Sequence, residues 1–359
     1  MKYLLICIAC MLCLPVLQAQ SGKTENLIIV TLDGMRWQEV FKGIDPVLTD
    51  DTLFNRDSKG LREKFWADNV EERRKKLFPF IWEVVSKEGQ LYGNRQFSNH
   101  VDNANPYWFS YPGYNEIFTG YPDTAVNSND KIWNKNTNVL EYINKQKGYQ
   151  QKVAAFSTWD VFPYILNEPR SGVYVNADVD TIPFNTPQLQ VLNDMQFLAP
   201  KPVGVRPDVI TYMAAREYLK TYKPKVLYIA FDETDDFAHA GLYDQYIGSA
   251  HAEDAMIRDI WNTVQGLPQY RNKTTLLITV DHGRGDIVKA NWCHHGTRIE
   301  DAHEIWLAVM GPDTKALGEL KTAGQLYQMQ IAATLAKLLG FTFTAEHPVA
   351  DPIKSVYSK

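Results

Sequence analysis

The chain has 359 residues, of which 45% are hydrophobic and 22% are charged, and its formal net charge at pH 7 is −5. A chain of this length can bury one large α/β core or two smaller ones. The acidic balance argues against a broad basic surface of the kind that binds nucleic acid.

The first residues have the pattern of a secretory signal peptide. Lys2 supplies a basic start, the run YLLICIACMLCLPVL is apolar, and small residues stand near Ala19. This pattern predicts that residues 1–20 are removed, with cleavage near Ala19 or Gln20, and that the protein is exported to the periplasm or secreted. The apolar run is too short to cross a bilayer comfortably, so we expect no membrane span in the mature chain. A retained membrane anchor is the alternative.

Cysteine usage gives no support to a disulfide framework. Cys7, Cys10 and Cys13 leave with the predicted signal peptide, and the mature chain, residues 21–359, keeps only Cys293. No intramolecular disulfide can then form. We expect a buried structural thiol at Cys293 and a fold held together by its core.

The mature chain alternates between strand patterns and helix patterns. The predicted strands are apolar, β-branched runs at 26–33, 152–158, 225–232, 274–281 and 304–311. The predicted helices include 207–222, 244–265 and 325–339. Strands that are hydrophobic almost throughout are typical of a parallel sheet covered on both faces. The alternation predicts one domain over 21–359, an α/β fold with a doubly wound, mostly parallel central sheet and helices on both faces.

Two segments have the character of insertions. Residues 42–76 are highly charged and end in EERRKK, which indicates a solvated face. Residues 160–206 carry many of the prolines and little regular pattern. This second segment could form a partly irregular lid over a site, and an irregular surface connection is the alternative.

Three predicted strands end in aspartate. Asp33 follows LIIVTL, Asp232 and Asp235 follow VLYIAF, and Asp281 follows LLITV. Open α/β sheets bind ligands at the carboxyl ends of their strands. One aspartate at such a position is usually a helix cap or a turn former. Three that converge on one sheet edge would repel one another without a cation, so the sequence predicts a metal site there.

Histidines accompany these aspartates. His239 lies four residues after Asp235, so the two side chains share a face if a helix begins there. His282 follows the last of the strand-terminal aspartates, and CHHGT adds His294 and His295. Histidine and carboxylate together suit zinc, with manganese as the alternative.

Five short motifs resemble, in the same order, those of the alkaline phosphatase superfamily. They are TLDG, a serine in FSYPGYNEIFTGYPD, DDFAH, VDHG and a late HHG. The likeness is closest to the nucleotide pyrophosphatase/phosphodiesterase branch, and residues 330–340 are similar to that branch's C-terminal helix. The resemblance covers most of the mature chain outside the two insertions. It implies a hydrolase that acts on a small-molecule phosphate ester.

The resemblance also implies two divalent metal ions, with zinc as the first expectation and manganese as the alternative. One ion would be held by Asp33, Asp281, His282 and the nucleophile Ser110. The other would be held by Asp235, His239 and His295. His295 is preferred to His294 because a glycine follows the family's late ligand, as Gly296 does here.

Ser110 is expected to attack phosphorus and form a phosphoserine intermediate, since a divalent cation lowers the pKa of a hydroxyl that binds it. Asn129 lies near the position of the branch's oxyanion-binding asparagine. Asn127 is the competing choice, and a role as turn asparagines remains open for both.

The sequence departs from the family in two places. The nucleophile is serine where the diesterase branch has threonine. SYPGY is also similar to the sulfatase signature, but that signature needs arginine where Tyr114 stands, so conversion of the serine to formylglycine is not expected. The alternatives to a diesterase are a phosphate monoesterase, a sulfatase, a phosphonate hydrolase, a phosphomutase and a binding protein without catalysis.

Charge near the nucleophile favours diesters over monoesters. The chain has no lysine or arginine between Arg95 and Lys131, and Ser110 lies in that gap. Enzymes that act on dianionic monoesters usually supply a cation for the non-bridging oxygens. Arg284 and Arg170 are the residues that could supply it from elsewhere in the chain. The gap is rich in aromatic residues: Tyr107, Trp108, Phe109, Tyr111, Tyr114, Phe118 and Tyr121.

Overall fold

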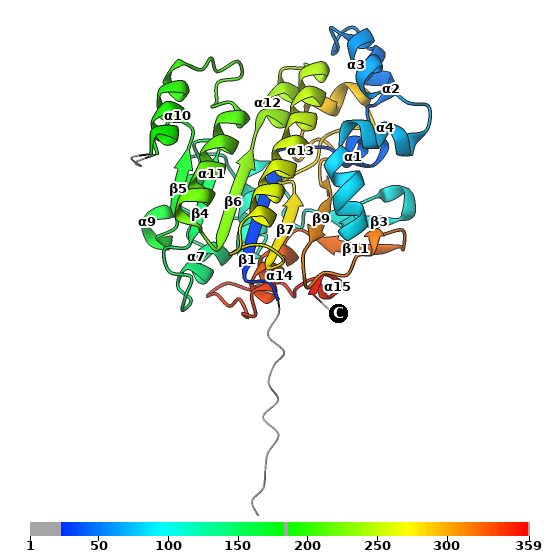
Figure 1. Ribbon diagram of the computed structural model, residues 1–359. Coiled ribbons are helices and arrows are strands. Elements are labelled where there is room, and N and C mark those ends of the chain that lie inside the picture. Colours follow the sequence, from blue (N-terminus) through cyan, green and yellow to red (C-terminus); the bar gives the residue numbers. More distant parts are fainter. Residues whose placement is uncertain (1–22, 183–185, 358–359) are drawn as a thin grey trace, which may run out of the picture.

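A central sheet of eight strands runs through the described residues of the computed structural model, 23–182 and 186–357 (Figure 1). In spatial order the strands are β10 (Gly318–Glu319), β2 (Gly89–Tyr92), β9 (Leu307–Met310), β7 (Thr274–Thr279), β1 (Asn26–Leu32), β6 (Val226–Phe231), β4 (Val153–Ser157) and β5 (Tyr174–Ala177). Neighbours from β7 to β5 pair in parallel, whereas β9 is antiparallel to β7 and β2. The prediction of a mostly parallel sheet is confirmed. The predicted signal peptide, 1–20, lies outside the described residues.

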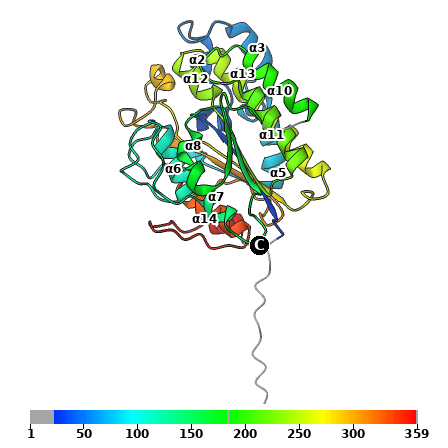
Figure 2. The ribbon, with the colours of Figure 1, turned by 90° about the vertical axis from the view of Figure 1, so that its left-hand side faces the viewer.

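Helices cover both faces of this sheet, as predicted, and Figure 2 shows the two layers on either side. One layer contains α10 (Pro187–Leu198), α11 (Asp208–Tyr222) and α13 (Tyr243–Gly266). The other contains α6 (Ser110–Thr119), α7 (Val139–Asn144), α8 (Phe162–Ile165) and α14 (Gln330–Leu338). Every residue of β1, β6 and β7 is buried, which is the burial that near-continuous apolar strands require.

The pairing register of β1, β6 and β7 aligns the carboxyl ends of these three strands. Leu32 pairs with Phe231, and Thr31 pairs with both Ala230 and Thr279. The residues that follow β1, β6 and β7 therefore leave the sheet at the same edge, where α12 (Glu233–His239) begins. This is the upper edge in Figure 1, whereas the described chain starts and ends at the lower side.

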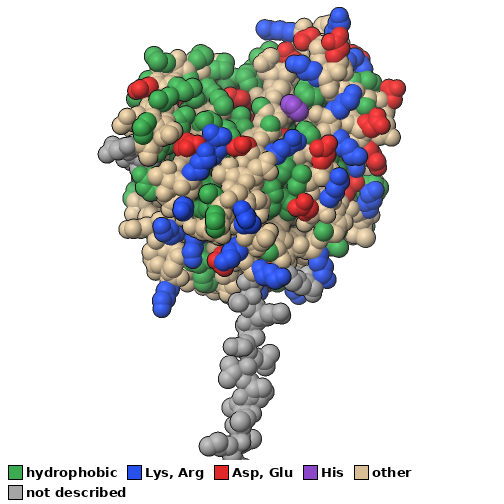
Figure 3. Space-filling view, in the orientation of Figure 1, with side chains coloured by type: hydrophobic (Ala, Val, Ile, Leu, Met, Phe, Trp, Pro, Cys, Tyr) green, Lys and Arg blue, Asp and Glu red, His purple; other side chains and the backbone are tan. Residues whose placement is uncertain are grey.

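The segment 42–76 folds as three helices, α2 (Pro46–Asp50), α3 (Ser58–Phe65) and α4 (Val70–Leu77), which follow α1 (Trp37–Lys42). Charged side chains gather over this part of the surface, at the right of Figure 3. Arg74 is an exception, because it is buried, pairs with Glu319 at 3.0 Å and lies over the ring of Trp82. Most of the charged side chains in this segment therefore face solvent, whereas Arg74 ties the segment to the rest of the fold through its ion pair with Glu319.

The segment 160–206 is more regular than its sequence indicates. It contains α8, α9 (Glu168–Ser171), β5 and α10. Strand β5 pairs in parallel with β4, so this part of the segment extends the central sheet.

A second, small sheet consists of β11 (Gly324–Tyr327), β3 (Asn99–Asp102) and β8 (Glu304–Ile305). The prediction of a helix over 325–339 is wrong at its start, because 324–327 pair with β3 and the helix begins only at Gln330. The predicted strand 304–311 is divided between β8 and β9, one in each sheet.

Short elements complete the fold. They are α5 (Ser86–Glu88), α15 (Lys354–Tyr357), the π-helical turn η1 (Ile81–Val85) and the 3-10 turns η2 (Arg95–Phe97) and η3 (Lys289–Cys293). Cys293 is a buried free thiol whose Sγ donates to the carbonyl of Ala290 at 3.3 Å. Within 23–182 and 186–357, no helix combines the length and hydrophobicity that a bilayer crossing needs.

Candidate metal centre and nucleophile

Two aspartates and a histidine converge at the common edge of β1 and β7. Asp33 directly follows β1, and Asp281 and His282 come two and three residues after β7. All three side chains are exposed by 1% or less. One carboxylate or ring atom from each lies within 4.8 Å of the others. Burial of this kind is unfavourable for carboxylates that lack a counter-charge.

The hydrogen bond of His282 fixes which ring nitrogen faces the carboxylates. Nδ1 lies 2.9 Å from the carbonyl oxygen of Gly283, and because a carbonyl only accepts, Nδ1 carries the hydrogen. In a neutral ring this leaves the lone pair of Nε2 directed at Asp281 Oδ2 and Asp33 Oδ1, at 3.3 and 3.4 Å. Neither of these two oxygens has a hydrogen-bond donor within the described chain. A lone pair that faces two unpaired buried oxygens fits a cation between them.

A second group of ligand atoms lies beside the first. Asp235 and His239 stand one turn apart on α12, and His295 comes from the loop after η3. His239 Nε2 is 3.1 Å from Asp235 Oδ2 and 2.9 Å from His295 Nε2. His295 Nε2 is 3.8 Å from Asp235 Oδ1. Ligand atoms around tetrahedral zinc are separated by roughly 3.3 Å, so these three residues are close enough to share one ion.

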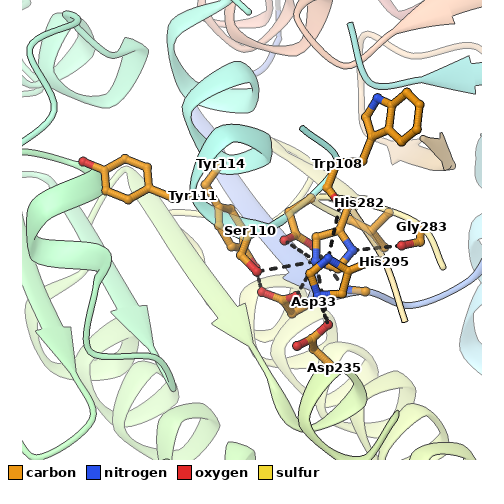
Figure 4. Close-up of polar contacts among 12 residues, drawn as sticks. Asp33, Trp108, Ser110, Tyr111, Tyr114, Asp235, His282, Gly283 and His295 are labelled. Atoms are coloured by element: carbon orange, nitrogen blue, oxygen red, sulfur yellow. Dashed lines mark hydrogen bonds and ion pairs between the residues drawn. The ribbon is translucent and has the colours of Figure 1, made fainter. Parts of the chain in front are cut away.

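His295 points toward Asp235 and His282 (Figure 4). Its Nδ1 lies 3.2 Å from the carbonyl oxygen of Trp108, and its ring stacks on that of His282 with centroids 3.9 Å apart. Burial, and then the nearby His282, lower the pKa of His295 well below its usual value. A neutral ring with Nδ1 committed to a carbonyl presents Nε2 as a ligand. The His294 side chain is exposed.

The carboxylates of the two groups differ in their electrostatic surroundings. Burial, and then Asp281 and Asp235, raise the pKa of Asp33 well above its ordinary value. Burial also raises the pKa of Asp281. Burial acts in the same direction on Asp235, but Arg284 and then His239 hold the pKa of that carboxyl well below its usual range. A nearby positive charge would help to keep Asp33 and Asp281 ionised, whereas Arg284 already does this for Asp235.

Ser110 reaches the same centre from the other helix layer. It is the first residue of α6, is 6% exposed, and its Oγ lies 3.4 Å from His282 Nε2 (Figure 4). The amide groups and the dipole at a helix N-terminus favour negative charge. Gly113 permits the approach of α6, because a Cβ there would lie only 2.3 Å from the carbonyl oxygen of Asp281.

The loop before Ser110 is held in an unusual conformation. Trp108 has a positive φ of 52°, which is uncommon for a residue with a side chain. Asn105 Oδ1 accepts hydrogen bonds from the amides of Tyr107 and Trp108, at 3.0 and 3.2 Å. The buried carboxylate of Glu116 in turn accepts from the Asn105 amide and side chain, each at 2.8 Å. These bonds fix the Trp108 carbonyl toward His295.

The asparagines and arginines predicted from the sequence occupy different surroundings. Asn129 Oδ1 accepts from the amide of Tyr111 at 2.9 Å, which places it beside the start of α6, whereas Asn127 lines a neighbouring pocket. Arg284 is buried and donates to Asp235. Arg170 pairs with Glu141 at 2.9 Å and donates to the carbonyls of residues 134–136.

Sequence reasoning missed the role of Tyr114. Its hydroxyl donates to Asp33 Oδ2 at 2.8 Å, which leaves Asp33 Oδ1 as the atom that faces His282. The sequence signal was available, because Tyr114 lies one helical turn after Ser110 and is thus placed on the same face of α6.

Comparisons with known proteins place the chain in a family and its fold among solved structures. Residues 43–338, most of the chain, match the family model described as type I phosphodiesterase / nucleotide pyrophosphatase. Asp33 precedes the matched segment. No curated protein matches the chain.

Solved structures show the same fold. The wild-type alkaline phosphatase PafA has 10% identity and a TM-score of 0.62, over 94% of this chain and 99% of its own. A putative sulfatase from Bacteroides thetaiotaomicron has 14% identity and a TM-score of 0.60, over 94% and 75%. The lipoteichoic acid synthase LtaP from Listeria monocytogenes has 14% identity and a TM-score of 0.57, over 91% and 75%. The fold is therefore that of the alkaline phosphatase superfamily.

Proposed function

Because the chain belongs to the type I phosphodiesterase / nucleotide pyrophosphatase family and hydrolyses phosphoric esters, we propose that it is an exported, metal-dependent phosphodiesterase that uses Ser110 as nucleophile. The observation that carries the proposal is the convergence of Ser110 with the two groups of ligand atoms. Export follows from the signal-peptide pattern of residues 1–20.

Two groups of residues would hold divalent cations. The first is Asp33, Asp281 and His282 with Ser110, and the second is Asp235, His239 and His295. The unpaired oxygens Asp33 Oδ1 and Asp281 Oδ2 support the first group, and the neutral ring of His295 supports the second. When bound, such cations supply Lewis-acid stabilisation of charge on oxygen at the reacting phosphorus. Mixed nitrogen and oxygen ligands favour zinc, and manganese is the alternative.

The reaction proceeds in two displacements at phosphorus, and the first uses Ser110 as the nucleophile. Ser110 Oγ loses its proton and attacks phosphorus, forming a P–O bond while the bond to the leaving alkoxide breaks, and that alkoxide takes up a proton and departs as the alcohol. The N-terminus of α6 stabilises the negative charge on the serine oxygen. Water then attacks phosphorus in the phosphoserine, the bond from phosphorus to Ser110 Oγ breaks, and the products are a phosphate monoester and Ser110 with its hydroxyl proton restored. Two displacements at phosphorus give net retention of configuration.

Asn129 is proposed to bind a non-bridging oxygen of the substrate. Its Oδ1 is committed to the amide of Tyr111, the residue after Ser110, so its Nδ2 is the group left to donate. An amide donor suits an oxygen that carries only part of a negative charge.

The surroundings of Ser110 favour a diester. Arg284 pairs with Asp235 and Arg170 pairs with Glu141, so each guanidinium already has a carboxylate partner, and only Nε and Nη1 of Arg284 are without a hydrogen-bond partner in the described chain. Trp133, which lines a pocket together with Tyr111, stacks on Tyr164 with centroids 4.3 Å apart and is 43% exposed. The hydroxyl of Tyr111 ties this pair to the nucleophile helix, because it donates to the Tyr164 carbonyl at 3.2 Å. An exposed aromatic surface suits the second organic group of a diester.

The experiment that tests the proposal is a set of parallel turnover assays. Purified protein is given an aryl phosphate diester, the matched monoester and the matched sulfate, each with zinc and with manganese. Turnover of the diester above the other two, lost in Ser110→Ala, is the expected result. A preference for the sulfate would contradict the proposed reaction, and a preference for the monoester would replace diesterase with monoesterase.

A further inference from the structure

Arg284 is a buried cation within the candidate metal centre. Its side chain is 1% exposed, and Nη2 donates to both the carboxylate Oδ1 and the main-chain carbonyl of Asp235, the latter at 3.1 Å. The contact joins a residue three positions after Asp281 to a residue of α12. The ion pair therefore involves Asp235, the carboxylate of the second ligand group, and neither carboxylate of the first group.

The fold makes space for this arginine at Gly34. A Cβ at Gly34 would lie 2.8 Å from Arg284 Nε and 2.7 Å from Asp235 Oδ1. Gly34 also has a positive φ of 58°, which a side chain would strain. Only a residue without a side chain leaves room beside Asp33 for the ion pair between Arg284 and Asp235. Nε and Nη1 of Arg284 have no hydrogen-bond partner in the described chain, so the guanidinium is held mainly by Asp235.

The two ligand groups therefore differ before any cation binds. In the first group, Asp33 Oδ1 and Asp281 Oδ2 have no hydrogen-bond donor among the residues that the structure describes. In the second group, Asp235 Oδ1 is paired with Arg284, and Oδ2 lies 3.1 Å from His239 Nε2. A cation entering the first group removes an electrostatic penalty. A cation entering the second group must replace an ion pair that already satisfies the carboxylate.

Counting the charges of the three ligand aspartates and Arg284 shows that a second cation is bound less favourably than the first, whichever group it enters. Asp33, Asp235 and Asp281 contribute three negative charges, and Arg284 offsets one of them. One divalent cation balances the remainder. A second makes the centre positive until an anionic substrate enters, which costs free energy in a buried site.

We propose that Arg284 acts as an internal counter-cation that makes the two cation sites unequal. A divalent cation binds tightly to Asp33, Asp281 and His282. A second binds more weakly to Asp235, His239 and His295, where it competes with Arg284 for Asp235. This inference rests on the proposed two-cation function and adds the order in which the sites fill.

The test is calorimetric titration of metal-free protein with Zn²⁺, with bound metal counted after dialysis. Wild-type protein should show two binding constants that differ by at least about fivefold, the lower range of coupling between ligands that affect each other. Arg284→Met removes the competing charge and keeps an unbranched apolar stem. It should tighten the weaker site by at least about fivefold and leave the tighter site unchanged.

Arg284→Lys and Arg170→Met are the controls. The lysine keeps a positive charge beside Asp235, so its weaker site should stay close to that of wild-type protein. Arg170→Met removes an arginine whose partner is Glu141, outside the centre, and should change neither constant. Arg284→Gln is the second neutral variant, and circular dichroism establishes that each variant is folded.

Three outcomes would overturn the inference. They are equal constants in wild-type protein, a weaker site unchanged in both neutral variants, and a weaker site that loses affinity in them. The last outcome would mean that Arg284 holds Asp235 in position as a ligand. Protein that binds no cation at either group would instead contradict the proposed metal dependence, so the two failures are distinguishable.

Discussion

The hydroxyl of Tyr114 donates a 2.8 Å hydrogen bond to Oδ2 of Asp33, and this bond links the nucleophile helix to the end of the central strand β1. Tyr114 is fully buried, and its ring packs on Phe162 with centroids 4.6 Å apart. Because the bond occupies Oδ2, Oδ1 of Asp33 is the oxygen directed at His282. One residue of α6 therefore orients a carboxylate of the candidate metal centre, while another residue of the same helix supplies the proposed nucleophile.

Tyr114→Phe is expected to weaken cation binding at the first group by about 10- to 100-fold, the usual cost of losing a residue that orients a ligand. The phenylalanine keeps the ring packing, so the folded structure should persist. Zn²⁺ titration measures the effect, with Tyr111→Phe as the control because its hydroxyl bonds to carbonyls outside the centre. Unchanged affinity in Tyr114→Phe would show that Asp33 is oriented by the backbone alone.

Ser110→Ala is expected to lower turnover by about a thousandfold or more, in the range seen when a nucleophile is removed. The variant keeps Asp235, His239 and His295, so it should still bind a cation. Ser110→Thr restores a hydroxyl and should recover part of the activity. Retention of configuration with a chiral phosphorus substrate is expected for wild-type protein. Inversion would mean that water attacks directly and that Ser110 is not the nucleophile.

Removal of metal should abolish activity and lower the melting temperature. Ions that bind only the folded state stabilise it by about 2.7 kcal/mol each when present at a hundredfold excess over Kd. Chelation followed by addition of zinc should restore both properties, with close to two ions bound per chain. Asp281→Asn, which weakens the first group, should respond less to added zinc. Full activity in exhaustively chelated protein that contains no metal would contradict the proposal.

The strand-end aspartates could be found from sequence because parallel strands in register place their carboxyl ends together. Asp33 and Asp281 each follow a mostly apolar, fully buried run, so their meeting needs no knowledge of loops. The Arg284–Asp235 ion pair could not be found in this way. It depends on how α12 packs over the turn at Gly34, which is a matter of tertiary packing.

The local sequence pattern also failed to predict two strands that form because they pair with a neighbouring strand. Residues 324–327 are mostly exposed and carry no strand alternation, yet they form β11 because β3 lies alongside. The same holds for β5 in the proline-rich segment 160–206, which joins the sheet through its pairing with β4. Long-range pairing overrides weak local preference in both cases.

Glu253→Gln is expected to flatten the dependence of stability on pH. Glu253 is 1% exposed, and burial followed by Asp208 and Glu233 raises its pKa well above the usual value. In the unfolded chain this group loses its proton near pH 4.3, about its ordinary pKa. Between that pH and the raised pKa the unfolded state binds fewer protons, so the free energy of unfolding falls as pH rises.

The neutral glutamine cannot ionise, so the variant should come closest to wild-type protein near pH 4, below the unfolded-state pKa, and melt about 2 °C or more above it at pH 9. Thermal melts followed by circular dichroism at several pH values measure this difference. The exposed Glu83→Gln is the control and should follow the wild-type curve. Parallel curves for Glu253→Gln and wild-type protein would mean that Glu253 is not the group that titrates.

The protein is expected to prefer diesters to matched monoesters by about tenfold or more in kcat/KM, a factor typical of one additional apolar group that finds a binding surface. A monoester brings one more negative charge than a diester and needs a cation on its non-bridging oxygens. The two arginines that could supply it are bound by Asp235 and Glu141. A diester instead brings a second organic group, which can lie on the exposed ring of Trp133.

Trp133→Ala provides the sharpest check, because it should lower kcat/KM for a diester with two aryl groups more than for an aryl methyl diester. Arg170→Ala should leave the ratio of diester to monoester turnover unchanged. Arg284→Ala, assayed at saturating zinc so that altered cation affinity does not enter, should also leave that ratio unchanged. A strong monoester preference that collapses in either arginine variant would mean that a guanidinium leaves its carboxylate to bind phosphate. In that case the electrostatic argument for diesters would be wrong, and the enzyme would be a monoesterase.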